Sequence, residues 1–373
     1  MYQVIIIGGG LAGLTSAIHL SKKRLDVLLI EKNRYPKHKV CGEYISNEVI
    51  PYLKYLNFDP FEHGAIKINR LTFSTSSSKT LTTKLPLGGF GISRYCIDQA
   101  LANKAKANGV KIIYESVIDV HFESDKFKIT TNNSDTYEAN TVLGAFGKRS
   151  NMDVNLKRSF MKESAPYLAV KAHYEGVFPD DLVSLHNFEG GYCGISKVES
   201  NRINVCYITD YKSFKKHKNI TDFEKKVLSK NIYLKKAFSN LTPVFEKPLT
   251  ISQISFSSKK LVEDHVIMCG DSAGLIHPLA GNGMSMAIRS ACIASDLIYK
   301  FLDGEIESRV ELEKKYIKMW KSEFQSRLTT GHIIARLFKI GFLTEALVSF
   351  IKLFPILLPS IIKMTHGKPM KIS

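Results

Sequence analysis

The sequence predicts an α/β fold built from two units and a helical C-terminus. Three observations carry this prediction: a strand–glycine loop–helix–strand pattern opens the chain, a second glycine-rich segment follows a buried strand near residue 270, and much of the stretch between them reads as antiparallel strands. We therefore expect a discontinuous first unit over 1–150 and 261–305, an inserted sheet over 151–260, and helices over 306–373. With 373 residues, 44% of them hydrophobic, the chain can bury a core in each unit.

The first thirty-one residues form the most specific pattern. Residues 2–7 read as a short apolar strand, residues 8–13 spell G-x-G-x-x-G and open a helix through Leu20, and a second strand ends on Glu31. This βαβ order is that of a Rossmann-like domain, in which the motif binds a pyrophosphate and the acidic residue binds a ribose. Glycines incidental to an ordinary strand–helix turn are the alternative, and the complete βαβ context argues against it.

Each glycine of the motif has its own physical task. Gly8 allows the tight turn, Gly10 lets the backbone approach a pyrophosphate, and Gly13 lets the helix pack closely on the strand. The helix N-terminus offers unpaired N–H groups and the positive end of its dipole to the phosphates. These features predict a bound dinucleotide.

The remaining elements follow in order. A polar loop over 32–43 precedes a helix near 47–56, and the alternating, Ser- and Thr-rich stretch 66–84 predicts a hairpin. Ser93 is a plausible N-cap for a helix that ends before Gly109. Further elements are expected as three short strands over 111–137, a buried strand over 141–145, antiparallel strands over 167–174, 182–188, 191–197 and 202–208, one or two helices over 221–241, a buried strand over 265–269 and a helix over 284–302.

The segment 268–284, M-C-G-D-S-A-G followed by H-P-L-A-G-N-G-M, is the second strong signal. It resembles the G-D segment of the superfamily of FAD-dependent hydroxylases (monooxygenases) and geranylgeranyl reductases. The resemblance implies a glutathione-reductase-type FAD domain in which Asp271 hydrogen-bonds the ribityl chain. It also implies that residues 281–284 bring backbone N–H groups to the N1–C2=O edge of the flavin, where a helix N-terminus stabilises negative charge.

Two further segments carry the resemblance. Arg94, after Ile-Ser, matches an arginine that contacts FAD in family members, with a surface arginine near a helix cap as the alternative. The loop 35–43 resembles the K-x-C-G loop beside the flavin and substrate of geranylgeranyl reductases. Ser46 stands where a redox dithiol would need a second cysteine, so Cys41 either takes part in the chemistry or forms a passive wall of the pocket.

The expected site can be stated residue by residue. FAD is expected to contact Gly8, Gly10, Leu11, Ala12, Gly13, Glu31, Lys32, Arg94, Gly270, Asp271, Gly281, Asn282, Gly283 and Met284. The candidates beside the reacting atoms are Cys41, Tyr192 and Pro278, with the pocket between the sheet around Tyr192 and the flavin face near Pro278. No metal site is expected.

The chain departs from the family pattern at two places. Phe146 stands where hydroxylases carry an Asp tied to FAD and NAD(P)H handling, which argues against NADPH or NADH as the direct electron donor. The Y-x-W-x-F-P sequence of geranylgeranyl reductases keeps only Tyr192, because Gly194 and Ser196 replace the large apolar residues. This favours a different or bulkier substrate. The single tryptophan, Trp320, argues against a flavin halogenase.

These observations predict an FAD-dependent oxidoreductase for a hydrophobic organic substrate. The leading interpretation is a monooxygenase acting through a flavin C4a-hydroperoxide, which needs a water-poor pocket. The alternative is a geranylgeranyl-reductase-like flavoprotein that reduces C=C bonds of a lipid, isoprenoid or polyketide. A non-catalytic FAD-binding protein is a distant third interpretation.

Charge and cysteine usage suggest the setting. The net charge of +17 favours anionic partners, such as an acidic ferredoxin-like donor or a membrane surface, and no motif supports nucleic-acid binding. The six cysteines are spaced as reduced thiols of a cytoplasmic protein, and no apolar run of ~20 residues predicts a spanning helix. The apolar stretch 329–364, interspersed with basic residues, fits either a basic amphipathic segment on the inner membrane surface or helices packed on the substrate unit. Packing of the helices on the substrate unit is favoured, because apolar helical stripes more often belong to a core.

Overall fold

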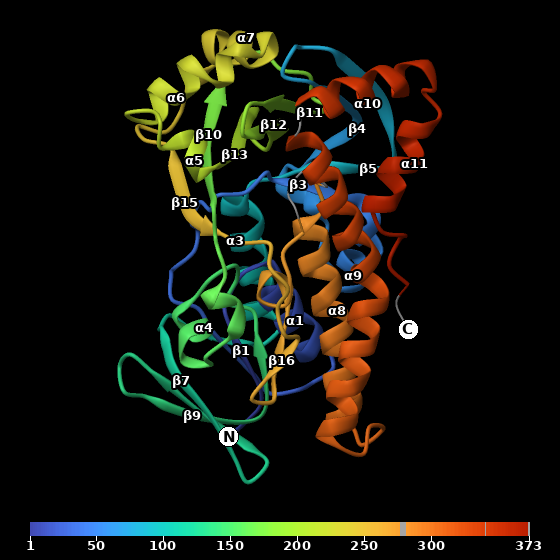
Figure 1. Cartoon of the computed structure of the whole chain (residues 1–373). Helices are drawn as coiled ribbons and strands as arrows, with labels where there is room; N and C mark the ends of the chain where they lie inside the picture. The colour runs from blue at the N-terminus through green and yellow to red at the C-terminus, as the bar shows by residue number, and fades with distance from the viewer. Residues whose placement is uncertain (277–280, 340, 372–373) are drawn as a thin grey trace.

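A computed structural model of the protein describes residues 1–276, 281–339 and 341–371. Two β-sheets lie at opposite ends of an elongated molecule (Figure 1). The long helices α8 (Gly283–Leu302) and α9 (Arg309–Lys339) run together along one side of it. Functional side chains can therefore gather where the two sheets face each other.

The first sheet has eight strands among the described residues. They are β1 (Tyr2–Ile7), β2 (Val27–Ile30), β6 (Lys111–Ile113), β7 (Val117–Glu123), β8 (Lys126–Thr131), β9 (Thr136–Gly144), β16 (Val262–Glu263) and β17 (Val266–Met268). The centre runs β17-β9-β1-β2-β6 and is parallel, while β7 and β8 extend β9 as antiparallel strands. The central strands β1 and β2 are continuous apolar runs and are largely buried, as is typical of the inner strands of a parallel sheet.

The connections reverse direction between β1 and β9, since β1 leads outward to β2 and β6 while β9 leads to β17 on the other side. In open parallel sheets, ligands bind beyond the carboxyl ends of the strands at this point. The glycine loop after β1 and the turn after β9 both lie there. The strand order reverses between β2 and β9, the two neighbours of β1, and this places the predicted site at the carboxyl end of β1.

The second sheet has nine strands among the described residues. They are β3 (Tyr44–Ser46), β4 (Ile66–Ser74), β5 (Thr80–Gly91), β10 (Tyr167–Glu175), β11 (Leu182–Phe188), β12 (Gly191–Val198), β13 (Arg202–Asp210), β14 (Thr242–Pro243) and β15 (Leu249–Ile254). Most neighbours are antiparallel, but β11 pairs in parallel with β4. The sheet therefore draws strands from residues 44–91 as well as from the insertion 151–260.

The two faces of the second sheet are separated by strand alternation. Cys193 and Tyr207 point into a core beneath α6 (Ile220–Lys226) and α7 (Ile232–Asn240). Their neighbours Tyr192 and Ile208 point to the opposite face, into a smaller apolar cluster that includes Leu275 from the second glycine-rich segment. One face is thus covered by its own helices, and the other looks toward the first sheet.

Helices complete the layers. α1 (Leu11–Lys22) packs between α8 and α3 (Arg94–Ala107), and the largest core fills the space around them. The other α-helices are α2 (Ile50–Tyr55), α4 (Asn151–Asn155), α5 (Tyr211–Phe214), α10 (Gly341–Leu353) and α11 (Leu357–Thr365). No helix within the described residues is both long and apolar enough to cross a bilayer.

The predicted fold class is confirmed: a parallel Rossmann-like sheet, a second sheet and C-terminal helices are all present. The expected hairpin is β4–β5, and the expected last helix of the first unit is α8. The proposed domain boundaries stay a prediction. All six cysteines are free thiols.

Candidate functional site

The glycine loop after β1 is shaped by two close backbone approaches. A Cβ on Gly8, whose φ is +105°, would lie 2.4 Å from the Ala145 carbonyl oxygen, and a Cβ on Gly13 would lie 1.9 Å from the Gly8 carbonyl oxygen. Only glycine fits at either position. Gly10 is the N-cap of α1 and no side chain caps the helix, so the first-turn N–H groups that include Leu11 and Ala12 remain available to a ligand.

Glu31 directly follows β2, and its side chain contacts this loop. One carboxylate oxygen accepts the Gly9 N–H at 2.7 Å, and the other accepts the Asn33 N–H at 3.0 Å. The Tyr35 hydroxyl donates to the Gly9 carbonyl oxygen at 2.6 Å. The Asn33 side chain also donates to the second carboxylate oxygen of Glu31 at 3.2 Å, so the oxygen that accepts from Gly9 is the one with a lone pair left for a hydroxyl donor. Lys32, by contrast, is exposed at the start of the loop.

Two half-buried cations, Arg94 and Lys39, lie beside the loop and share the buried carboxylate of Asp98. Arg94 holds Asp98 through two bonds of 2.8 Å, and Lys39 reaches the same carboxylate at 2.8 Å. Although burial opposes ionisation, these two cations keep the pKa of Asp98 below its usual value. A Cβ on Gly10 would meet only the Arg94 guanidinium, at 3.5 Å. Two cations against one carboxylate leave a net positive charge beside Gly10.

The second glycine-rich segment meets the same place from the other end of the chain. Burial alone would lower the pKa of Arg94. Electrostatic interactions with Asp98, Cys41 and Asp271 outweigh burial, so the pKa of Arg94 lies above its usual value. Asp271 therefore acts electrostatically on Arg94. The predicted contact Gly270 opens the short turn before it with φ +62°.

The start of α8 lies in the same region. Gly281 has φ +62° and faces the ring of Tyr44. Asn282 is buried, and its side-chain oxygen has no hydrogen-bond partner among the described residues. α8 then begins at Gly283 without a side-chain cap, followed by the buried Met284. The candidate Pro278 lies outside the described residues.

The turn after β9 closes the site. The Gly147 N–H donates to the Ser272 hydroxyl at 2.9 Å, and the Lys259 ammonium donates to the carbonyl oxygens of Lys148 and Asp271 at 2.7 and 2.8 Å. Burial lowers the pKa of Lys259 to about 8. These bonds join the turn after β9 to the turn after β17. This connection was not predicted from the sequence.

The two remaining candidates lie on the side of the second sheet. Asn204 on β13 donates to the carbonyl oxygens of Cys41 and Gly42 at 3.2 and 2.9 Å, so the sheet holds the backbone of the cysteine loop. Tyr192 is buried in the apolar cluster with Val40, the residue before Cys41. The second sheet therefore contacts the cysteine loop through Asn204 and through the cluster of Tyr192 with Val40, and the roles of Cys41 and Tyr192 stay predictions.

Comparison with known proteins shows what the chain resembles. Residues 2–152 match the family described as pyridine nucleotide-disulphide oxidoreductases. A digeranylgeranylglycerophospholipid reductase of Methanosarcina acetivorans is 25% identical over 350 residues, covering 90% of this chain and 82% of that enzyme. A tryptophan 2-halogenase of Chondromyces crocatus is 22% identical over 355 residues, covering 89% and 66%. The structure of flavin-dependent brominase Bmp2 has a TM-score of 0.81 at 18% identity, covering 99% and 94%.

The chain is similar over most of its length to proteins of the superfamily of FAD-dependent geranylgeranyl reductases and monooxygenases. It is an FAD-dependent oxidoreductase, as the sequence predicts. The charged and polar groups observed at the site have the chemistry that binding of FAD requires.

The residues present fit FAD. The net positive charge of Arg94 and Lys39 beside Gly10 suits a pyrophosphate, and the uncapped start of α1 points N–H groups at the same side. The uncapped start of α8 and the orphaned oxygen of Asn282 suit the polar edge of the flavin. The individual contacts stay predictions, and Lys32, on the exposed side, has the least structural support.

A buried charge cluster at this site was missed by the sequence analysis. Glu43 accepts from Lys171 at 2.5 Å, from His173 at 2.7 Å and from the Arg94 backbone N–H at 2.8 Å. Burial opposes ionisation of Glu43, but the His173 hydrogen bond and the Lys171 charge hold its pKa below the usual value. The available signal was the alternation of Lys171 and His173 in an otherwise apolar strand, which places both on one face of β10.

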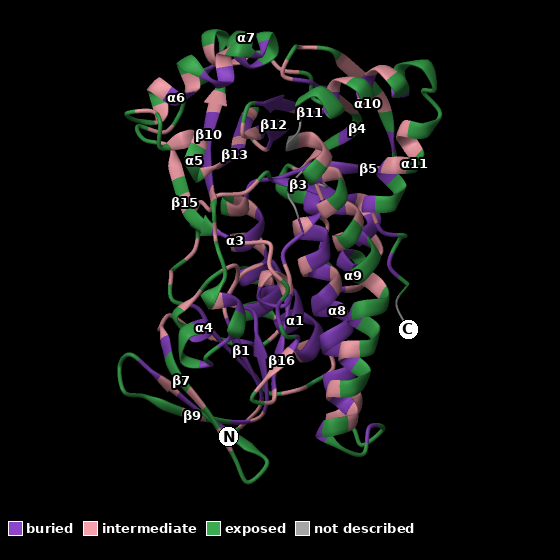
Figure 2. Ribbon diagram, in the orientation of Figure 1, coloured by how far each residue is buried: buried purple, intermediate pink, exposed green. Residues whose placement is uncertain are grey.

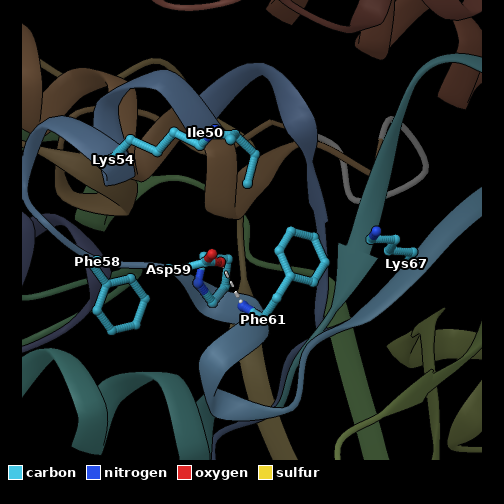
Figure 3. A pocket seen from close by; sticks show the side chains of 7 residues that line it. Ile50, Lys54, Phe58, Asp59, Phe61 and Lys67 are labelled. Atoms are coloured by element: carbon cyan, nitrogen blue, oxygen red, sulfur yellow. Dashed lines mark hydrogen bonds between the residues drawn. The ribbon is translucent and has the colours of Figure 1, made fainter.

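A separate cavity of about 310 Å³ lies among α2, the turn 60–63 and β4. Figure 3 shows the rings of Phe58 and Phe61 in it, with Lys54 and Lys67 at its edges, and the Asp59 carboxylate bonded to the Phe61 N–H at 2.9 Å. None of the predicted site residues lines it. It is therefore not part of the FAD site.

Proposed function

We propose that this flavoprotein reduces carbon–carbon double bonds of a prenylated lipid, with electrons from an acidic protein donor. The observation that carries the proposal is a buried apolar cluster between the second sheet and the FAD loops, which would form one wall of the substrate site. Tyr192, Ile208 and Ile254 from three strands of the sheet meet Val40 and Leu275 from the two loops. A wall of this composition suits a long apolar chain and excludes water.

The sequence relatives support a substrate of this class. The Methanosarcina acetivorans relative is named for the reduction of a digeranylgeranylglycerophospholipid, and a second Methanosarcina protein with the same name is 25% identical over 349 residues. The structural neighbours include halogenases at 15–19% identity, a level that indicates the fold alone. We therefore rank reduction above monooxygenation, reversing the order that the sequence suggests.

The chain's own residues would bind, orient and keep water out. Bound FAD supplies the transfer of hydride or electrons. Arg94 and Lys39 would neutralise the pyrophosphate, the α8 N-terminus would stabilise negative charge at the flavin edge, and Asn204 would fix the Cys41 loop against the substrate wall. Each reduced double bond takes up a proton as well as the hydride that bound FAD would supply.

The proposed donor rests on charge and on one replacement. Phe146 stands in the turn after β9, and its ring lies 2.8 Å from the position of a Cβ on Gly144. An apolar ring there replaces the carboxylate associated with NAD(P)H handling. The net charge of +17 would attract an acidic redox protein.

Monooxygenation remains the second candidate. Gly194 and Ser196 on β12 stand where the geranylgeranyl-reductase pattern has two large apolar residues. The smaller side chains change the shape of the wall relative to the geranylgeranyl-reductase pattern. A bulkier ring substrate would use that space.

The test has two steps. In the first step, the flavin absorbance is followed anaerobically after addition of NADPH, NADH or a reduced ferredoxin, with dithionite as the positive control. In the second step, the mass of the product formed from a geranylgeranylated lipid is measured by mass spectrometry. We expect bleaching by ferredoxin and a gain of two hydrogens for each double bond. Rapid bleaching by NADPH or NADH with a gain of one oxygen in air would establish the monooxygenase instead.

A matched pair of variants tests the wall. Tyr192→Ser should lower kcat/KM while flavin content stays the same, because Tyr192 lines the apolar wall. Cys193→Ser changes the neighbouring residue, which points to the opposite face, and should alter neither quantity. Equal effects of the two substitutions would contradict the placement of the substrate.

A further inference from the structure

The last two helices present an unusually apolar outer surface. The six consecutive residues 352–357, which run from the end of α10 to the start of α11, are all exposed, and five of them are apolar. Leu353 is 75% exposed and Ile356 is 82% exposed, and Phe342 at the start of α10 is 80% exposed. Figure 2 shows this corner as largely exposed. A soluble surface seldom gathers so many large apolar side chains.

The exposure follows from how α10 is attached. Its inner face buries Thr344, Val348 and Ile351. Glu345 fixes the orientation by accepting from the Ser77 hydroxyl at 2.6 Å, at the turn between β4 and β5. The opposite face carries Phe342, Ala346, Phe350 and Leu353, spaced along one side of the helix. An outer helix face is ordinarily polar, so this one has the composition of a covered face.

The charges around the surface show what would cover it. Residues 346–373 contain four lysines and no aspartate or glutamate. Lys352, Lys363, Lys368 and Lys371 are all exposed. Exposed apolar side chains flanked by lysines match the interface of a bilayer that contains anionic lipids. Two copies of the same surface would instead bring lysines against lysines.

We propose that α10, the turn after it and α11 lie in the headgroup region of an anionic phospholipid bilayer. α10 has 13 residues, which at about 1.5 Å each gives a rod of roughly 20 Å, too short for a hydrocarbon core of about 30 Å. The segment therefore lies in the interface and does not span. This inference goes beyond the proposed function and does not depend on it.

The geometry also connects this surface to the FAD site. On its inner side α11 packs Ile362 against Tyr44, Ile68 and Leu85 of the second sheet. The ring of Tyr44 in turn faces Gly281, just before α8. A bilayer on the outer side of α11 would thus lie one layer of side chains from the sheet that faces the flavin loops.

Vesicle flotation with the full chain tests the proposal. We expect the protein to float with phosphatidylcholine vesicles that contain phosphatidylglycerol, to float poorly with phosphatidylcholine alone, and to lose binding as salt is raised. The double substitution Phe354→Ser with Ile356→Ser should lower the partition coefficient at least tenfold. Lys352→Gln with Lys363→Gln should lower it about fivefold for each lysine.

Two matched controls separate the surface from general effects. Val177→Ser alters a side chain that is 97% exposed on the turn between β10 and β11, outside α10 and α11. Lys215→Gln with Lys216→Gln removes the same charge from an exposed stretch after α5. Both controls should float like the wild type. Because all substituted residues are exposed, flavin content and circular dichroism should be unchanged in every variant.

Three results would overturn the proposal. The wild type could fail to float with the phosphatidylglycerol vesicles, or the patch variants could float as well as it does. Alternatively, sedimentation velocity could show a dimer that Phe354→Ser with Ile356→Ser abolishes, without vesicle binding, which would assign the surface to a second copy. None of these measurements uses a substrate, so their failure is distinct from failure of the proposed reaction.

Discussion

Glu43 holds two basic side chains in the interior at the junction of the two sheets. Lys171 and Glu43 are both fully buried, and His173 is nearly so. Removing one partner of such a cluster leaves an uncompensated buried charge, which costs more than the pair contributes. The cluster also fixes the backbone of Arg94, so its integrity bears on the FAD site.

Lys171→Met should therefore lower the free energy of unfolding by about 3–5 kcal/mol, measured by chemical denaturation. The control is Lys226→Met, which removes an exposed partner of Asp222 and should cost about 0.5 kcal/mol. Similar losses for the two variants would show that the buried cluster contributes no more than a surface pair.

At Glu31 the expected effect is on cofactor retention. Glu31→Ala removes the acceptor of the Gly9 N–H and the carboxylate expected to bind the ribose, so the variant should lose FAD during gel filtration. Glu31→Gln keeps an oxygen that can accept from Gly9 and should lose less. Wild-type flavin content in Glu31→Ala would refute the assigned contact.

His186 makes stability depend on pH. Burial lowers the pKa of His186 to about 4 from an ordinary value of 6.5, and its Nδ1 lies 2.8 Å from the Ser74 hydroxyl. Between these values the unfolded chain binds the proton and the folded protein does not, so stability falls as pH falls from 6.5 toward 4. The loss should reach about 3 kcal/mol by pH 4. Denaturation series at several pH values should show a shallower decline in His186→Gln.

Among the elements, the C-terminal tail is tied unexpectedly tightly to the region behind α8. The Met370 N–H donates to the Glu48 carbonyl oxygen at 2.9 Å, and the side-chain nitrogen of Asn282 donates to the Thr365 carbonyl oxygen at 3.0 Å. A Cβ on Gly367 would lie 1.6 Å from a Glu48 carboxylate oxygen. The tail therefore buttresses the start of α8.

Gly367→Ala should displace this tail and lower the free energy of unfolding by about 1–3 kcal/mol through overpacking. Gly341→Ala, at a position where a Cβ would meet nothing within 4 Å, should be neutral or slightly stabilising, since alanine favours helix. Denaturation curves of the pair decide between the two outcomes. If both variants unfold at the same denaturant concentration, the tail does not buttress α8.

The elements also show how far the sequence could predict the molecule. Gly8, Glu31 and the start of α8 could be placed because their constraints lie within a few residues of the chain. The pairing of Glu43 with Lys171 spans 128 positions, and the parallel pairing of β4 with β11 joins residues near 70 to residues near 183. Such contacts depend on how the two sheets dock, which no local pattern contains. The second sheet thus gained β3, β4 and β5 from outside the predicted insertion.

On the scale of the whole molecule, FAD should stabilise the fold because its expected contacts come from two segments far apart in the sequence, residues 8–13 and 270–284. At about a hundredfold excess over the Kd, FAD should add about 3 kcal/mol to the free energy of unfolding of the apoprotein. Riboflavin lacks the pyrophosphate expected to face Arg94 and should add much less. Equal thermal shifts for the two compounds would show that Arg94 and Lys39 do not bind phosphate.

The split of the first sheet has a consequence for biosynthesis. β1 supplies the glycine loop, but β17 and the start of α8, which complete the same edge of the sheet, come more than 250 residues later. A chain still on the ribosome carries the early half of the cofactor site for most of its translation without the late half. Flavin capture is thus timed to the end of synthesis, and cellular FAD supply would act on nearly finished chains, not on nascent N-terminal domains.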